Sequence, residues 1–86
     1  PDDSVKSDAE LEDFVRHHCR TSYHPVGTCR MGSDDGSVVD VELKVHGFEG
    51  LRICDSSVFP SLIGSNTNAP TAMVAEKASD LIRNSQ

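Results

Sequence analysis

Apolar and aromatic positions recur at helical spacing near the start of the chain, at Leu11, Phe14, Val15 and His18. Ser7 and Glu10 precede this stretch and form the pattern of a capping box, in which each side chain satisfies an amide of the first turn. Acidic residues occupy the first turn and basic residues the last, as the helix dipole favours. The pattern predicts a helix from about Ser7 to about Cys19.

A second apolar stripe lies near the end of the chain and consists of Val74, Ala78, Leu81 and Ile82. Pro70 comes shortly before it, and proline is favoured at the first position of a helix. The sequence therefore predicts a second helix that starts near Pro70.

The middle of the chain gives a weaker pattern. Residues 20–37 contain one Pro and three Gly and predict no single regular element. Residues 38–45 alternate loosely and residues 51–54 form a short β-like run, so we expect two strands that flank a turn. Because an isolated pair of strands is marginal in water, we expect the chain to complete a larger sheet rather than to fold alone.

Composition narrows the function classes. The 86 residues carry a net charge of −6, which excludes nucleic acid and anionic membrane surfaces as expected partners. No apolar run approaches the ~20 residues of a membrane span. An odd cysteine count is a poor disulfide framework and favours a reducing compartment, with the cytoplasm slightly preferred.

Two segments carry the most specific information. Residues 23–32 read YHPVGTCRMG, and residues 47–60 read GFEGLRICDSSVFP, followed by NTNAPT at 66–71 and MVAEKA at 73–78. In order and spacing, over about residues 8–83, the chain resembles the C-terminal part of the glucose–methanol–choline (GMC) oxidoreductases, which are FAD enzymes that oxidise alcohols.

The resemblance implies a fold. The family pairs an FAD-binding α/β domain with a substrate domain on an antiparallel sheet, so the expected class is an α/β fragment that contributes to both domains. Residues 1–6 would be a connector, 7–45 part of the substrate domain and 46–86 part of the FAD domain.

The family's dinucleotide-binding pattern, G-x-G-x-x-G, does not occur among the six glycines. We therefore expect a fragment or cleavage product whose partner is the remainder of a parent enzyme that carries this motif, and which is inactive alone.

Alcohol oxidation needs a group that handles the hydroxyl proton, and His suits this task near neutral pH. By motif, His24 matches the family's catalytic His, which implies that it accepts the hydroxyl proton or hydrogen-bonds the developing alkoxide. Asn66 matches the family's second active-site position, where its amide would donate to the substrate oxygen. Without this context, His24 would be read as a loop histidine bonded to backbone and Asn66 as a turn residue.

The resemblance also implies contacts with FAD. The positive end of the second helix would face the flavin edge that becomes negative on reduction, through Asn66, Thr67, Asn68 and Ala69. Asp55 and Ser56 would lie near the ribityl and pyrophosphate groups. For Asp55, a turn or cap is the competing interpretation.

Three alternatives remain open at this point. His17, His18, Cys19, His24 and Cys29 are metal-ligand types, but their spacing is not that of zinc modules, so no metal site is expected. An acidic interaction module without chemistry would leave the two loop motifs unexplained. A hydroxynitrile lyase type of relative would bind FAD without net redox chemistry, although the family's redox pattern GTCRMG is kept at 27–32.

Overall fold

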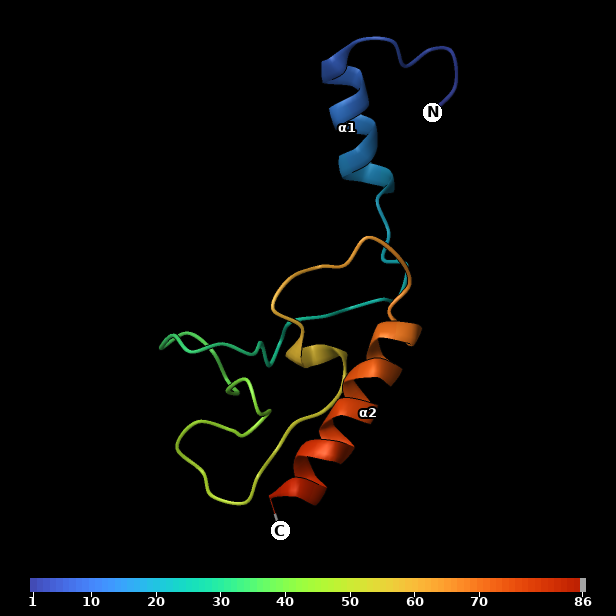
Figure 1. Ribbon diagram of the computed structural model, residues 1–86. Coiled ribbons are helices and arrows are strands. Elements are labelled where there is room, and N and C mark those ends of the chain that lie inside the picture. Colours follow the sequence, from blue (N-terminus) through green and yellow to red (C-terminus); the bar gives the residue numbers. More distant parts are fainter. Residues whose placement is uncertain (86) are drawn as a thin grey trace.

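The computed structural model describes residues 1–85. Its elements are helix α1 (Asp8–His18), the short 3₁₀ helix η1 (Ser56–Val58) and helix α2 (Asn68–Asn84). Figure 1 shows α1 standing apart at one end, while α2, η1 and the long loops gather at the other. The chain is accordingly elongated, with extents of 62 × 27 × 14 Å.

Helix α1 confirms the predicted capping box. The Ser7 hydroxyl accepts from the Glu10 amide at 3.2 Å, and a Glu10 carboxylate oxygen accepts from the Ser7 amide at 2.9 Å. Phe14 stacks on His18, with ring centroids 4.2 Å apart. No residue of α1 is buried in the described structure, and its apolar positions Leu11 and Val15 are 39% and 57% exposed.

Helix α2 is also confirmed, although it begins at Asn68, two residues before the predicted start. Pro70 therefore occupies the third helical position. It is tolerated there because the amides of the first turn have no intrahelical acceptor to lose. Along the predicted stripe Val74 and Ala78 are buried, while Ile82 is 42% exposed.

The prediction of strands at 38–45 and 51–54 is wrong. Within residues 1–85 the backbone pairing consists of isolated bridges, which are Met31–Val39, Val39–Val45 and Lys44–Arg52. A tight turn interrupts the first expected strand, because the Asp40 carboxylate accepts from the amides of Glu42 and Lys44. Leu43 takes a left-handed φ of 65° inside this turn. Hydrogen bonds from the Asp40 side chain to nearby amides thus take the place of the strand pairing that the alternating apolar pattern suggested.

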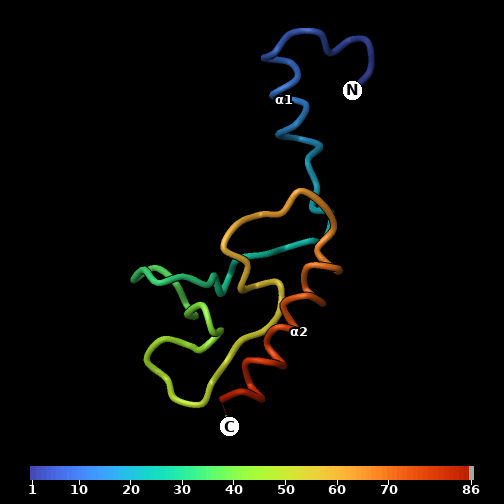
Figure 2. Tube along the Cα trace, viewed as in Figure 1, coloured from blue at the N-terminus to red at the C-terminus, as the bar shows by residue number. Residues whose placement is uncertain are grey.

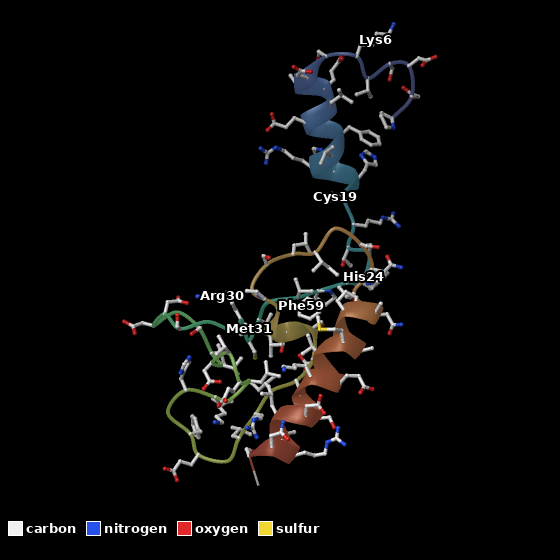
Figure 3. All side chains as sticks on the ribbon, viewed as in Figure 1. Lys6, Cys19, His24, Arg30, Met31 and Phe59 are labelled. Atoms are coloured by element: carbon white, nitrogen blue, oxygen red, sulfur yellow. The ribbon has the colours of Figure 1, made fainter. Side chains whose placement is uncertain are left out.

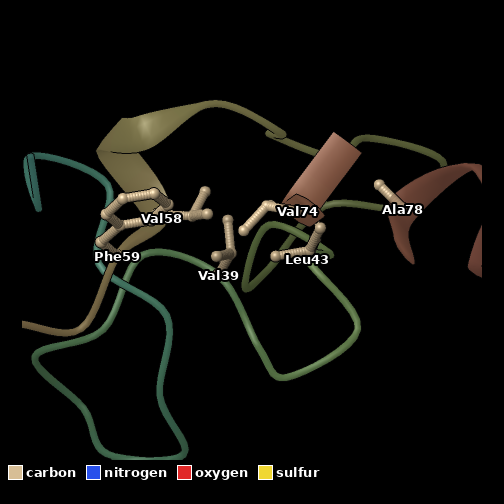
Figure 4. Packing of buried hydrophobic residues seen from close by; sticks show 6 residues of the cluster. All are labelled: Val39, Leu43, Val58, Phe59, Val74 and Ala78. Atoms are coloured by element: carbon tan, nitrogen blue, oxygen red, sulfur yellow. The ribbon is translucent and has the colours of Figure 1, made fainter. Parts of the chain in front are cut away.

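The buried apolar cluster consists of Val39, Leu43, Val58, Phe59, Val74 and Ala78 (Figure 4). It joins the loop at 38–45, η1 and the inner face of α2 into one body. Residues from both predicted domain portions contribute to it. The α/β class, the contribution to two domains and the boundary at residue 45 stay predictions, since residues 1–85 by themselves form no sheet.

The path of the chain positions the motif residues. Figure 2 shows the trace leaving α1, passing the beginning of α2 and then crossing to the long green loops in the middle of the chain. We call residues 20–31 the His24 loop. Over residues 1–85, neither helix combines the length and hydrophobicity that crossing a bilayer requires.

Candidate active site

The His24 loop is held against η1 by backbone hydrogen bonds. Every second amide of the loop donates to the next carbonyl of η1. The three donor–acceptor pairs are Gly27 to Ser56 at 3.3 Å, Cys29 to Ser57 at 2.8 Å and Met31 to Val58 at 2.9 Å. The Ser56 hydroxyl adds a bond of 3.1 Å to the Pro25 carbonyl. The segment that carries His24 therefore takes its course from residues about thirty positions further along the chain.

Two residues of this loop have left-handed backbone geometry. Gly27 has a φ of +85°, and a Cβ there would lie 3.4 Å from the Phe59 carbonyl oxygen. Tyr23 has a φ of 63° and is 85% exposed, so it directly precedes His24 in a conformation that side chains rarely adopt. Strain of this kind costs about 1–3 kcal/mol and is concentrated at functional sites.

His24 meets the beginning of α2. Its Nδ1 lies 2.9 Å from the Thr67 hydroxyl oxygen, and the Thr67 amide donates to the same nitrogen at 3.4 Å. Figure 3 shows the half-buried His24 beside the first turn of α2. The two residues are 43 positions apart. Asn66 directly precedes Thr67 and is exposed, so the fold brings both residues predicted to act on substrate to one end of α2.

The first turn of α2 presents unused donors. Thr67 is the N-cap residue, yet its φ of −82° and ψ of −12° are helical and its side chain makes no capping bond. Within residues 1–85 the amides of Asn68 and Ala69 have no recorded acceptor, and both residues are exposed. Such a helix end favours an anion. This donor set fits the flavin edge that carries negative charge after reduction.

The side chains of Asp55 and Ser56 both make hydrogen bonds to other parts of this chain. The Asp55 carboxylate caps η1 by accepting from the Ser57 amide at 2.8 Å. Hydrogen bonds from Ser57, through its side chain first and its backbone second, lower the pKa of Asp55. The Ser56 hydroxyl is used on Pro25. These bonds agree with the capping interpretation, and the predicted contacts of both residues with FAD stay predictions.

An ion pair links the end of the His24 loop to the turn that follows it. Arg30 donates to both carboxylate oxygens of Asp34, at 2.9 and 2.7 Å. This guanidinium lowers the pKa of Asp34 to about 2. Gly32 lies inside the turn, where a Cβ would come within 2.6 Å of an Asp34 oxygen. Arg30 and Gly32 of the motif thus lie together at this ion-paired turn.

The residues considered for a metal site do not converge. Nδ1 of His17 lies 2.8 Å from the Asp13 carbonyl, and Nδ1 of His18 lies 2.9 Å from the Phe14 carbonyl. Both contacts are local to α1. In the part of the chain that the structure describes, no group of three His, Cys, Asp or Glu side chains is arranged to hold a metal ion.

The family model described as GMC oxidoreductase matches residues 1–75. The chain belongs to the GMC oxidoreductase family. An oxygen-dependent choline dehydrogenase of Klebsiella pneumoniae subsp. pneumoniae is 52% identical over 86 residues, which are the whole chain and 16% of that relative. One of Pseudomonas aeruginosa is 54% identical over the same span and 15% of its length. The family resemblance seen in the two loop motifs is confirmed.

A solved structure is similar to this GMC segment. Pyridoxine 4-oxidase from Mesorbium loti matches with a TM-score of 0.86 and 34% identity, over 92% of this chain and 16% of that one. The chain thus spans about one sixth of the length of the relatives that it matches. At this level of identity, a solved relative shares the arrangement of loops and helices described above.

One feature of the GMC segment was not predicted from its sequence, namely the contact between His24 and Thr67. Sequence reasoning placed Thr67 among the cofactor contacts only. Its position directly after Asn66, at the start of a helix, was the available signal.

Proposed function

We propose that this chain is the C-terminal catalytic part of a larger FAD-dependent enzyme that oxidises an alcohol to an aldehyde or ketone. We call this larger chain the parent enzyme, and its remainder would carry the dinucleotide-binding motif. The observation that carries the proposal is the meeting of His24 with the first turn of α2, next to Asn66. The small core and the uncovered apolar positions of α1 support a segment that packs against further protein.

In this proposal His24 takes the hydroxyl proton of the alcohol through Nε2, because Nδ1 is already engaged by Thr67. The Asn66 amide donates to the same substrate oxygen and stabilises the charge that develops there. When bound, FAD supplies the acceptor for the hydride from the carbinol carbon. The free amides of Asn68 and Ala69 would hold the flavin edge that becomes negative.

The division of the segment follows the same proposal. Residues 7–45 would belong to the substrate side, with 1–6 as a connector, and residues 46–86 to the FAD side within an α/β architecture. Packing of η1 against the His24 loop would then link the two sides at the active site.

The relatives at 52% and 54% identity are named for choline, so choline is the first alcohol to test. A lyase without net redox chemistry is the second candidate within the family. Bleaching of the flavin by an alcohol in the absence of oxygen would distinguish the two.

The experiment is a comparison of His24→Gln with the unchanged parent enzyme. Gln keeps polar character but cannot take a proton, so flavin reduction by choline without oxygen should slow by ~10²-fold or more. The fraction of enzyme with bound FAD, read from its visible absorption, should stay the same.

His17→Gln is the matched control, since His17 lies exposed on α1 and bonds only locally. It should reduce its flavin at the normal rate. Near-normal reduction in the His24 variant would remove His24 from the reaction and contradict the proposal.

A further inference from the structure

Thr67 departs from the rule for its position. Thr at an N-cap usually has extended backbone geometry and accepts from an amide of the first turn, which stabilises a helix by about 1 kcal/mol. Here the backbone is helical and the side chain makes no capping bond. The hydroxyl instead lies 2.9 Å from Nδ1 of His24. Local rules are broken mainly where function requires it.

We propose that Thr67 is a positioning residue that determines which nitrogen of His24 faces the substrate and which nitrogen carries the hydrogen. The proposal rests on the function proposed above. In it, the Thr67 hydroxyl accepts the hydrogen on Nδ1, and Nε2 is thereby left free to take the hydroxyl proton of the alcohol.

The two contacts of Thr67 act in opposite directions. Neutral His24 can take a proton at Nε2 only when its own hydrogen is on Nδ1. The Thr67 amide can only donate, so it favours a lone pair on Nδ1 and a hydrogen on Nε2. Its distance of 3.4 Å lies beyond the usual range of about 2.7–3.2 Å, whereas the hydroxyl is at 2.9 Å and can accept. In the proposal the closer hydroxyl outweighs the amide by accepting from Nδ1, which gives the tautomer that works as a base.

No charged group competes for this role among the described residues. A catalytic His is often oriented by a carboxylate, but over residues 1–85 the recorded side-chain partner of His24 is Thr67 alone. The adjacent Tyr23 side chain is 85% exposed, and Pro25 has no polar side-chain group. The Thr67 hydroxyl is thus the side-chain group that orients the ring.

Thr67 is itself held in place. Its carbonyl accepts from the Thr71 hydroxyl at 2.6 Å and from the Thr71 amide at 3.0 Å. The position of the Thr67 hydroxyl is therefore set by the first turn of α2, and the ring of His24 is oriented by a rigid element rather than by its own loop.

The test uses Thr67→Val in the FAD-loaded parent enzyme. Val keeps the shape and removes the hydroxyl, which leaves the amide as the contact to Nδ1. The rate of flavin reduction by choline, normalised to bound flavin, should fall about tenfold, as when the group orienting a functional His is removed. Thr67→Ser, which returns the hydroxyl, should restore the rate.

Ser79→Ala is the matched control, since it removes an exposed hydroxyl further along the same helix, away from His24. It should leave the rate of flavin reduction unchanged. If Thr67→Val binds too little FAD, Thr67→Ala makes the same deletion with a smaller side chain.

Normal reduction by Thr67→Val, or reduction by Thr67→Ser as slow as by Thr67→Val, would overturn the inference. If the proposed function itself were wrong, the result would differ, because choline would reduce the flavin of His24→Gln at the normal rate.

Discussion

Helix α1 and the His24 site are built from contacts of very different range. In α1 the polar contacts join residues three or four positions apart, such as Ser7 with Glu10 and Arg16 with Glu12. At the site, His24 and Thr67 are 43 positions apart, and Pro25 and Ser56 are 31 apart. One region follows from its own sequence, whereas the other exists only after the chain has folded back.

The two helix starts show what this difference means for function. Ser7 caps α1 as its sequence pattern requires, and over residues 1–85 its side chain bonds only to Glu10. Thr67 stands at the equivalent position of α2 but gives its hydroxyl to His24. A helix start that follows the local rule is structural here, and the one that departs from it lies at the site.

The largest effect should come from removing the packing beneath the site. Phe59 is 4% exposed and follows η1, which holds the His24 loop. Phe59→Ala should destabilise the parent enzyme by about 3 kcal/mol, the scale of a large cavity in a core. Thermal release of flavin, followed by its fluorescence, should occur at a clearly lower temperature.

Phe48→Ala is the control for this change, because Phe48 is 66% exposed in the described structure. It should release its flavin close to the normal temperature. If both variants released flavin at equally lowered temperatures, the burial of Phe59 would not be what supports the site.

Local signals in the sequence predicted both helices, since capping and apolar spacing act within a few residues. They failed at 38–45, where alternation suggested a strand but Asp40 bonds to the amides of Glu42 and Lys44 and forms a turn. Strand formation depends on partners elsewhere, and in the described residues only single bridges form. Periodicity carries no information about such partners.

The site was predictable only through the family motif. His24 and Asn66 are recognised by the residues around them, and their roles stay predictions. The contact of His24 with Thr67 could not be read from spacing, because it depends on how η1 and α2 pack. The backbone strain at Tyr23 likewise left no sequence signal, since an exposed Tyr is common in loops.

A smaller effect should separate strain at the site from strain elsewhere. Gly27 and Gly47 both have left-handed φ, of +85° and +79°. Ala at either position should cost about 1–2 kcal/mol in stability. Only Gly27→Ala should also slow flavin reduction. Gly27 lies three residues after His24, and its amide donates to the Ser56 carbonyl, which holds the loop in place. Rates measured per bound flavin, beside melting temperatures, would check this. If Gly47→Ala slowed reduction equally, the His24 loop would not be the strained segment that matters.

The smallest effect tests whether α1 forms from its own sequence alone, as its short-range contacts indicate. In a peptide of residues 3–22, Ser7→Ala removes the hydroxyl that accepts from the Glu10 amide, which should cost about 1 kcal/mol of helix stability. Helicity measured by circular dichroism should fall, while Ser22→Ala, beyond the end of the helix, should not change it. Because helices of this length are marginal in water, the difference is best measured at low temperature. A peptide whose helicity ignores Ser7 would show that α1, like the His24 site, depends on contacts outside its own sequence.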